Sequence, residues 1–135
     1  MRRVFADTFY WLALFIPDDQ WAEDAGAVDV SEASLVTTDE VLSEFLTGVC
    51  ARGDHLRRLA CQVVRQILSN PSVEVVVQSH ESFLADLALY ERRSDKQYSL
   101  VDCISMNVMK QRQVREILTH DLHFSQKGFR RLLSR

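Results

Sequence analysis

The fold is first indicated by the stretch Val4-Phe5-Ala6-Asp7-Thr8. The residues from Arg3 to Asp7 form a short apolar run with a β-branched valine, which predicts a buried strand. The segment from Thr8 to Phe15 then carries apolar residues at helical spacing. The predicted strand therefore ends on a carboxylate, and Asp7 is the first candidate site residue.

Strand and helix patterns alternate along the rest of the chain. Further strands are predicted at residues 34–37, 73–77 and 117–120. Capping signals for the helices are Asp18 or Asp19, a Thr37 and Glu40 capping box, Asp54, Ser79 and Ser99. No hairpin signal such as Asn-Gly joins two strands, so the pattern favours an α/β fold with a central parallel sheet and helical crossovers. The tail after Gly128 has no clear pattern.

Size and composition are those of a compact globular protein. The chain has 135 residues, of which 47% are hydrophobic and 26% are charged, and we expect a single domain over residues 1–135. The three cysteines, Cys50, Cys61 and Cys103, lie within apolar helical patterns and are predicted to be core residues in a reducing compartment. No apolar run approaches the roughly 18 residues that a membrane span needs, so we expect a cytoplasmic protein.

Charge is unevenly distributed although the net charge is only -3. Basic residues gather in three clusters: Arg92, Arg93 and Lys96; Lys110, Arg112 and Arg115; Lys127, Arg130, Arg131 and Arg135. Solvated helix ends and tails explain each cluster taken singly. Bases that flank an acidic centre would also suit a phosphate backbone.

Four carboxylates, distant in sequence, are the candidate site. Asp7, Glu44, Asp102 and Asp121 each lie where an apolar segment ends or where a helix begins. Ligands of open parallel sheets gather beyond the carboxyl ends of the strands, so these acids could converge at one sheet edge. Buried carboxylates are compensated when they share a cation, and hard oxygen ligands select Mg²⁺ or Mn²⁺. The sequence thus predicts a metal-dependent active site.

Each acid also has an ordinary structural explanation. Asp7 could cap a helix, Asp102 could complete a capping box with Ser99, Glu44 could be a surface residue and Asp121 a turn residue. Two nearby histidines, His120 and His123, are predicted to be loop or strand-end residues and not ligands. The four glycines are scattered, which disfavours a phosphate-binding loop.

Segments over nearly the whole chain resemble a PIN domain. They are Phe5-Ala6-Asp7-Thr8, then Thr37-Thr38 with Val41 and Glu44, then Asp95-Lys96 with Tyr98-Ser99-Leu100-Val101-Asp102-Cys103, and last Leu118-Thr119-His120-Asp121-Leu122-His123-Phe124 before Gly128-Phe129. The resemblance implies a three-layer α/β/α fold with a central parallel sheet. Many PIN domains are Mg²⁺- or Mn²⁺-dependent ribonucleases, including small VapC-type toxins of toxin/antitoxin pairs, and this chain is similar to that type.

Carried over by residue, the resemblance makes Asp7, Glu44, Asp102 and Asp121 the catalytic, metal-binding quartet, with Thr8 and Ser99 as supporting hydroxyls. Phe9 departs from the family, in which a small polar residue often follows the Asp-Thr pair. The implied function is a metal-dependent endoribonuclease that acts as the toxin of a type II toxin/antitoxin pair. Alternatives are a PIN nuclease of rRNA or tRNA maturation and a catalytically silent module that binds RNA or protein.

Partners follow from the same resemblance and from one aromatic region. We expect an RNA substrate, a cognate antitoxin and a homodimer, and no membrane association. The region around the first two short helices holds more apolar residues than one core-facing stripe needs: Trp11, Leu12, Leu14, Phe15 and Trp21. Exposed patches of this kind commonly mark interfaces. We therefore expect this region to join two copies or to receive an antitoxin segment, unless both tryptophans simply complete the core.

Overall fold

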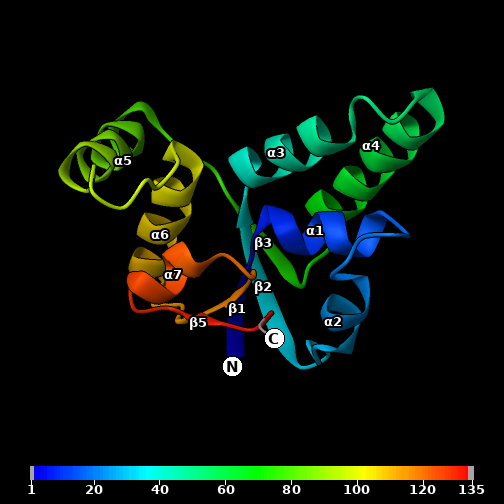
Figure 1. Cartoon of the computed structure of the whole chain (residues 1–135), viewed down its shortest axis with the longest axis horizontal. Helices are drawn as coiled ribbons and strands as arrows, with labels where there is room; N and C mark the ends of the chain where they lie inside the picture. The colour runs from blue at the N-terminus through cyan, green and yellow to red at the C-terminus, as the bar shows by residue number, and fades with distance from the viewer. Residues whose placement is uncertain (1, 134–135) are drawn as a thin grey trace.

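A parallel sheet forms the centre of the computed structural model, which describes residues 2–133 (Figure 1). The strands are β1 (Arg2–Ala6), β2 (Ala33–Thr38), β3 (Val73–Val76), β4 (Glu116–Leu118) and β5 (Arg130–Arg131). Their spatial order is β3-β2-β1-β4-β5, and every neighbouring pair is parallel. Arg135, counted above in the third basic cluster, lies outside the described residues.

Helices cover both faces of this sheet. They are α1 (Thr8–Phe15), α2 (Ala22–Ala27), α3 (Asp39–Val49), α4 (Asp54–Ser69), α5 (His80–Arg92), α6 (Leu100–Arg112) and α7 (Leu122–Gln126). Figure 1 shows α1, α2 and α4 on one side and α5, α6 and α7 on the other, with α3 across the top of the view. The predicted three-layer α/β/α fold with a central parallel sheet is confirmed.

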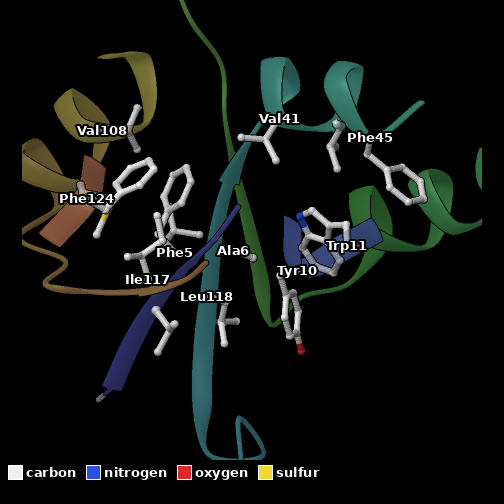
Figure 2. Close-up of a cluster of buried hydrophobic side chains, with 14 of the residues drawn as sticks. Phe5, Ala6, Tyr10, Trp11, Val41, Phe45, Val108, Ile117, Leu118 and Phe124 are labelled. Carbon is white, nitrogen blue, oxygen red and sulfur yellow. The ribbon is translucent and has the colours of Figure 1, made fainter. Parts of the chain in front are cut away.

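The central strand β1 is buried on both faces, as expected for a parallel sheet between helical layers. Val4, Phe5 and Ala6 are fully buried. Figure 2 shows Phe5 on the side of Val108 and Phe124, whereas Trp11 and Phe45 lie on the opposite side of the sheet. Burial of a side chain as large as Phe5 contributes about 1.5–3 kcal/mol to folding, so the core fixes the position of the strand that precedes Asp7.

Strand order determines where a ligand site can form. The chain proceeds from β1 through β2 to β3 and then returns to β4 on the other side of β1. The direction of winding therefore reverses between β1 and β4, whose register pairs Ala6 with Leu118. Ligands of open α/β sheets bind at such a reversal, outside the carboxyl ends of the strands. Asp7 follows β1 directly at this point.

The helix after β2 starts one residue later than predicted. Thr38 is its N-cap, and its Oγ1 accepts a hydrogen bond from the Val41 N–H at 3.1 Å. Thr37 belongs to the buried strand, and its Oγ1 donates to the Ala6 carbonyl at 2.9 Å. The predicted Thr37 and Glu40 capping box is wrong, because pairing with β3 extends β2 through Thr38.

Other element ends differ by a few residues. Trp21 holds the N-cap position of α2, although Asp19 Oδ1 accepts from the Trp21 N–H at 2.8 Å and so orders the preceding turn. Gly53 precedes α4, and Asp54 is its first residue. The strand predicted at residues 117–120 is β4, and the tail without a pattern supplies the edge strand β5.

Two of the three cysteines are not in the core. Cys103 is fully buried, as predicted, but Cys50 and Cys61 are exposed. Cys50 lies just past the end of α3, and Cys61 lies on the solvent side of α4, next to the buried Ala60. The prediction from apolar spacing was therefore wrong for these two cysteines, which lie beside the buried faces of α3 and α4 and not on them.

The region around α1 is less exposed than predicted. Trp11 is buried, and Phe15 packs edge-on against Phe45 with ring centroids 5.4 Å apart. Among the five apolar residues of this region, Leu14 alone is largely exposed, at 49%. Trp11 therefore belongs to the core and not to an exposed aromatic patch, and the role of this region as an interface stays a prediction. Exposed apolar residues also occur on α5, where they are Phe83, Leu84, Leu87 and Tyr90.

None of the helices within residues 2–133 has the length and hydropathy of a membrane span.

Candidate active site

One cleft brings together all six of the predicted site residues. Its volume is about 560 Å³, and its lining includes Asp7, Thr8, Glu44, Ser99, Asp102 and Asp121. They come from the end of β1, from α1 and α3, from the start of α6 and from the turn before α7. The cleft thus lies at the reversal of winding between β1 and β4. These residues are close together in space, and their catalytic roles stay a prediction.

Asp7 is the most deeply buried of these acids, with 4% of its surface exposed. It occupies the N-cap position of α1 without a capping hydrogen bond from its side chain, so helix capping does not explain it. Its pKa is raised to about 7, mainly by burial and to a smaller extent by the charges of Asp102 and Glu44, against the lowering effect of hydrogen bonds with Thr119 and the Thr8 backbone. This carboxylate is held in a place that disfavours its own charge.

Glu44 is held toward Asp7 by the residue that follows Asp7 in the chain. Thr8 Oγ1 donates to Glu44 Oε1 at 2.7 Å. The contact needs α1 and α3 to lie close together, and Gly48 permits this, because a Cβ there would lie 3.0 Å from Leu12 Cδ2. Thr8 therefore orients the Glu44 carboxylate, and its role as a supporting hydroxyl of the site stays a prediction.

Asp102 has both of the roles considered for it. Ser99 Oγ accepts from the Asp102 N–H at 3.0 Å, and Asp102 Oδ2 accepts from the Ser99 N–H at 3.1 Å, which completes a capping box. The same carboxylate lines the cleft. Burial raises its pKa, and so does the charge of Asp121, whereas the Ser99 N–H and His123 lower it. Capping fixes the orientation of a group that also faces the other acids.

Asp121 lies three residues beyond β4 and caps α7. Its Oδ1 accepts from the His123 N–H at 2.9 Å. His123 Nδ1 then lies 3.4 Å from Asp121 Oδ1 and 3.4 Å from Asp102 Oδ2. One ligand atom from each of these three residues falls within 4.8 Å of the others, a spacing that suits a metal ion. His123 is therefore a helix residue at the site, and its prediction as a loop residue was wrong.

Glu40 and Phe9 also line the cleft, and neither was among the predicted site residues. Glu40 Oε1 is buried with no hydrogen-bond partner among the described residues. Glu40 and Glu44 are four residues apart and therefore lie on one helix face, so the sequence spacing could have indicated Glu40 as a site residue. Phe9 is 39% exposed.

His120 lies outside this acidic set. Its ring packs between Phe9, at a centroid distance of 4.1 Å, and Trp21, on which it stacks at 4.5 Å and 7°. Burial lowers its pKa, which favours the neutral ring between two aromatic neighbours. These contacts anchor the chain just before Asp121.

The acidic residues fit a divalent cation. Asp7, Glu40, Glu44, Asp102 and Asp121 bring carboxylates to one cleft, and one of their oxygens is buried without a partner in the described chain. Mutual repulsion among these acids disfavours their charged forms, and a shared cation would relieve it. Oxygen ligands suit Mg²⁺ or Mn²⁺, while the His123 nitrogen also suits a transition metal such as Mn²⁺.

Comparisons with known proteins agree with this geometry. The 23S rRNA-specific endonuclease VapC20 of Mycobacterium tuberculosis is 28% identical over 127 residues, which cover 93% of this chain and 95% of that protein. The crystal structure of M. tuberculosis VapC20, described as a sarcin-ricin loop cleaving toxin, matches with a TM-score of 0.83 at 25% identity, over 93% of this chain and 95% of that one.

A more distant structure shares the fold alone. The structure of FitAcB from Neisseria gonorrhoeae matches with a TM-score of 0.64 at 14% identity, over 95% of both chains. The PIN domain profile matches residues 4–130, a range that holds every residue of the acidic cleft. The profile match covers most of the chain, and the parallel sheet between two helical layers agrees with it. The chain therefore belongs to the PIN domain family.

Proposed function

We propose that this protein is a metal-dependent endoribonuclease that hydrolyses RNA phosphodiester bonds and acts as the toxin of a type II toxin/antitoxin pair. The observation that carries the proposal is the convergence of Asp7, Glu44, Asp102 and Asp121 in one cleft. Four segments far apart in sequence supply these acids, and their repulsion has no structural benefit of its own.

The relatives support the same activity. VapC20 is named an endonuclease specific for 23S rRNA, and its similarity to this chain extends over almost the whole of both proteins. We propose ribosomal RNA as the substrate class, with the sarcin-ricin loop as the first target to test. Action on ribosomal RNA agrees with the predicted cytoplasmic location.

The chain's own groups would hold and orient the reacting parts. When bound, a divalent cation would lower the pKa of an attacking water and offset negative charge on the phosphate. Asp7, Asp102 and Asp121 would hold that cation, with Glu44 oriented by Thr8. The Ser99 capping box fixes the Asp102 carboxylate before any ligand arrives. Preorganisation of this kind avoids a rearrangement during the reaction.

The decisive experiment is cleavage of purified ribosomes and total RNA with Mg²⁺ or Mn²⁺ present, followed by mapping of the new 5′ ends. We expect cuts by the wild type that disappear in EDTA and in Asp7→Asn. Glu81→Gln, an exposed acid on α5 away from the cleft, is the matched control and should cut normally. Wild-type cleavage by Asp7→Asn at equal protein concentration would exclude the proposed site.

Cut positions separate this proposal from a maturation nuclease. A toxin should cut within functional RNA, whereas a maturation enzyme should cut at the boundary of a precursor. A silent module would cut nothing, and the complete acidic set disfavours it.

Partnership is a further part of the proposal. We propose that the protein is one nuclease domain over residues 1–135 that forms a homodimer and binds an antitoxin encoded by an adjacent gene. Light scattering of the purified chain, alone and with that gene product, measures both associations. A monomer at micromolar concentration that does not bind this product would exclude both.

A further inference from the structure

A second concave surface lies beside α6 and differs in charge from the acidic cleft. It has a volume of about 720 Å³, and its charged lining residues are Arg92, Lys110, Arg115 and Lys127. No acid contributes to it. We call these four residues the basic pocket. In a chain with a net charge of -3, such a pocket is not a consequence of overall composition.

Four separate segments supply these cations. Arg92 ends α5, Lys110 is in the last turn of α6, Arg115 directly precedes β4, and Lys127 follows α7. The three basic clusters seen in the sequence each contribute to this one surface. Tertiary folding therefore converts scattered charges into a single positive site.

The basic pocket is not neutralised by its surroundings. Several cations elsewhere in the chain are paired, as in Arg2 with Glu116 at 2.9 Å and Arg3 with Glu74 at 2.6 Å. Within residues 2–133, no ion pair or side-chain hydrogen bond involves any of the four basic-pocket residues. The neutral Asn107 in the same lining already binds Asp86 at 2.8 Å.

The surroundings of Lys127 also contain more positive than negative charge. Burial lowers its pKa, and Arg93, Arg92 and Lys110 lower it further through like-charge repulsion. The floor beneath it is apolar and includes the buried Met106 and Met109. Lys127 is half-buried, so an anion would interact with its charge more strongly than at an open surface, whereas Arg92, Lys110 and Arg115 are exposed and accessible to a ligand.

The basic pocket and the acidic cleft share structural elements. Asp102 and Lys110 lie eight residues apart on α6, which corresponds to roughly 12 Å along a helix at 1.5 Å per residue. Asp121 and Lys127 lie at the two ends of α7. A polyanion that reaches the acidic cleft must overcome repulsion from its carboxylates, and cations nearby on the same helices would supply the attraction.

We propose that the basic pocket binds backbone phosphates of the RNA strand whose scissile bond lies in the acidic cleft. The inference rests on the proposed ribonuclease function and adds to it a substrate-binding site outside the acidic set. RNA is favoured over an acidic protein segment because a phosphodiester chain carries a charge at every unit and can reach both sites at once.

The test is RNA affinity as a function of salt. Fluorescence anisotropy of a labelled single-stranded RNA is measured in EDTA, which prevents cleavage, for the wild type and for Lys127→Gln and Arg92→Gln. Each lost phosphate contact should reduce the magnitude of the slope of log affinity against log salt by about 0.7. A tenfold rise in salt would then weaken RNA binding by a factor that is about five-fold smaller than for the wild type. Lys127→Arg should retain the wild-type slope.

Arg65→Gln is the matched control. Arg65 is exposed and forms no ion pair among the described residues, but it lies on α4, on the other side of the sheet in Figure 1. Its slope should equal that of the wild type. Melting temperatures of all variants should agree, because none of these side chains contributes to the core.

The outcomes separate this inference from the proposed function. If the wild type cuts RNA but Lys127→Gln and Arg92→Gln keep the wild-type salt dependence of RNA affinity, the phosphate site is refuted and the nuclease proposal is not. Reduced slopes in a protein that cuts no RNA would support phosphate binding at the basic pocket but would refute the nuclease proposal and the placement of a scissile bond in the acidic cleft. With cleavage present, both variants should raise KM and leave kcat unchanged, because they contact substrate away from the reacting atoms. Unchanged RNA slopes with weaker binding of the adjacent gene product would assign the pocket to a protein and overturn the inference.

Discussion

Removal of the Asp7 charge should stabilise the metal-free protein at alkaline pH. Asp7 is 4% exposed, and its pKa in the folded chain is about 7, against an ordinary value of 3.8. A difference of about three units corresponds to about 4 kcal/mol, at 1.36 kcal/mol per unit. Burial is the main cause, followed by the neighbouring carboxylates, and Asp7→Asn removes both effects.

The sign follows from proton linkage. Between pH 4 and pH 7 the folded protein keeps a proton on Asp7 that the unfolded chain has released, so the free energy of unfolding falls as pH rises. The loss reaches about 4 kcal/mol above pH 7 and is absent below pH 4. Asp7→Asn should lack this fall, and a smaller one should remain because burial also raises the pKa of Asp102.

Urea unfolding in EDTA at pH 4, 6 and 8 measures the effect, with the free energy taken by linear extrapolation. Asp18→Asn, a change in the exposed loop after α1, is the control and should follow the wild type. Saturating Mn²⁺ should restore the wild type at pH 8, because the cation replaces the proton as the compensating charge. Parallel pH profiles for the wild type and Asp7→Asn would refute this reasoning.

Three further predictions concern two other acids of the cleft and the cap of α3. Saturating Mn²⁺ should raise the melting temperature of the wild type but not of Asp102→Asn, because a ligand stabilises only the state that binds it, and equal shifts would place the metal elsewhere. Glu40→Gln should weaken Mn²⁺ binding in calorimetry without unfolding the protein, because Glu40 Oε1 is buried in the cleft without a partner in the described chain, and unchanged affinity would show that this acid is not part of the metal site. Thr38→Ala should lower the free energy of unfolding by about 1 kcal/mol through loss of the bond to the Val41 N–H, and a change within the error of urea titration would contradict the capping assignment.

Local patterns predicted most of the elements and the principal acids. An apolar run followed by helical spacing placed β1 and α1, and the carboxylate between them marked the site. Ser79 and Ser99 were correctly identified as helix caps, because a capping residue bonds within its own first turn. Such signals depend on neighbours in the sequence and can therefore be read without a structure.

Features that depend on residues far apart in sequence could not be read this way. The identity of the α3 cap depended on whether Thr37 would bond to the Ala6 carbonyl, and this depends on the pairing of β1 with β2. The exposure of Cys50 and Cys61 depended on how α3 and α4 pack, because helical spacing defines a face without identifying which face becomes the core.

For this protein, the sequence alone determined the alternation of strands and helices and the acids that end or begin them, since both are encoded within a few neighbouring residues. The strand order β3-β2-β1-β4-β5, the proximity of His123 to Asp102 and Asp121, and the gathering of Arg92, Lys110, Arg115 and Lys127 were decided by the tertiary structure. The physical reason is that burial of the sheet between two helical layers brings these segments together, and the free energy of that burial is a property of the whole core and not of any one segment.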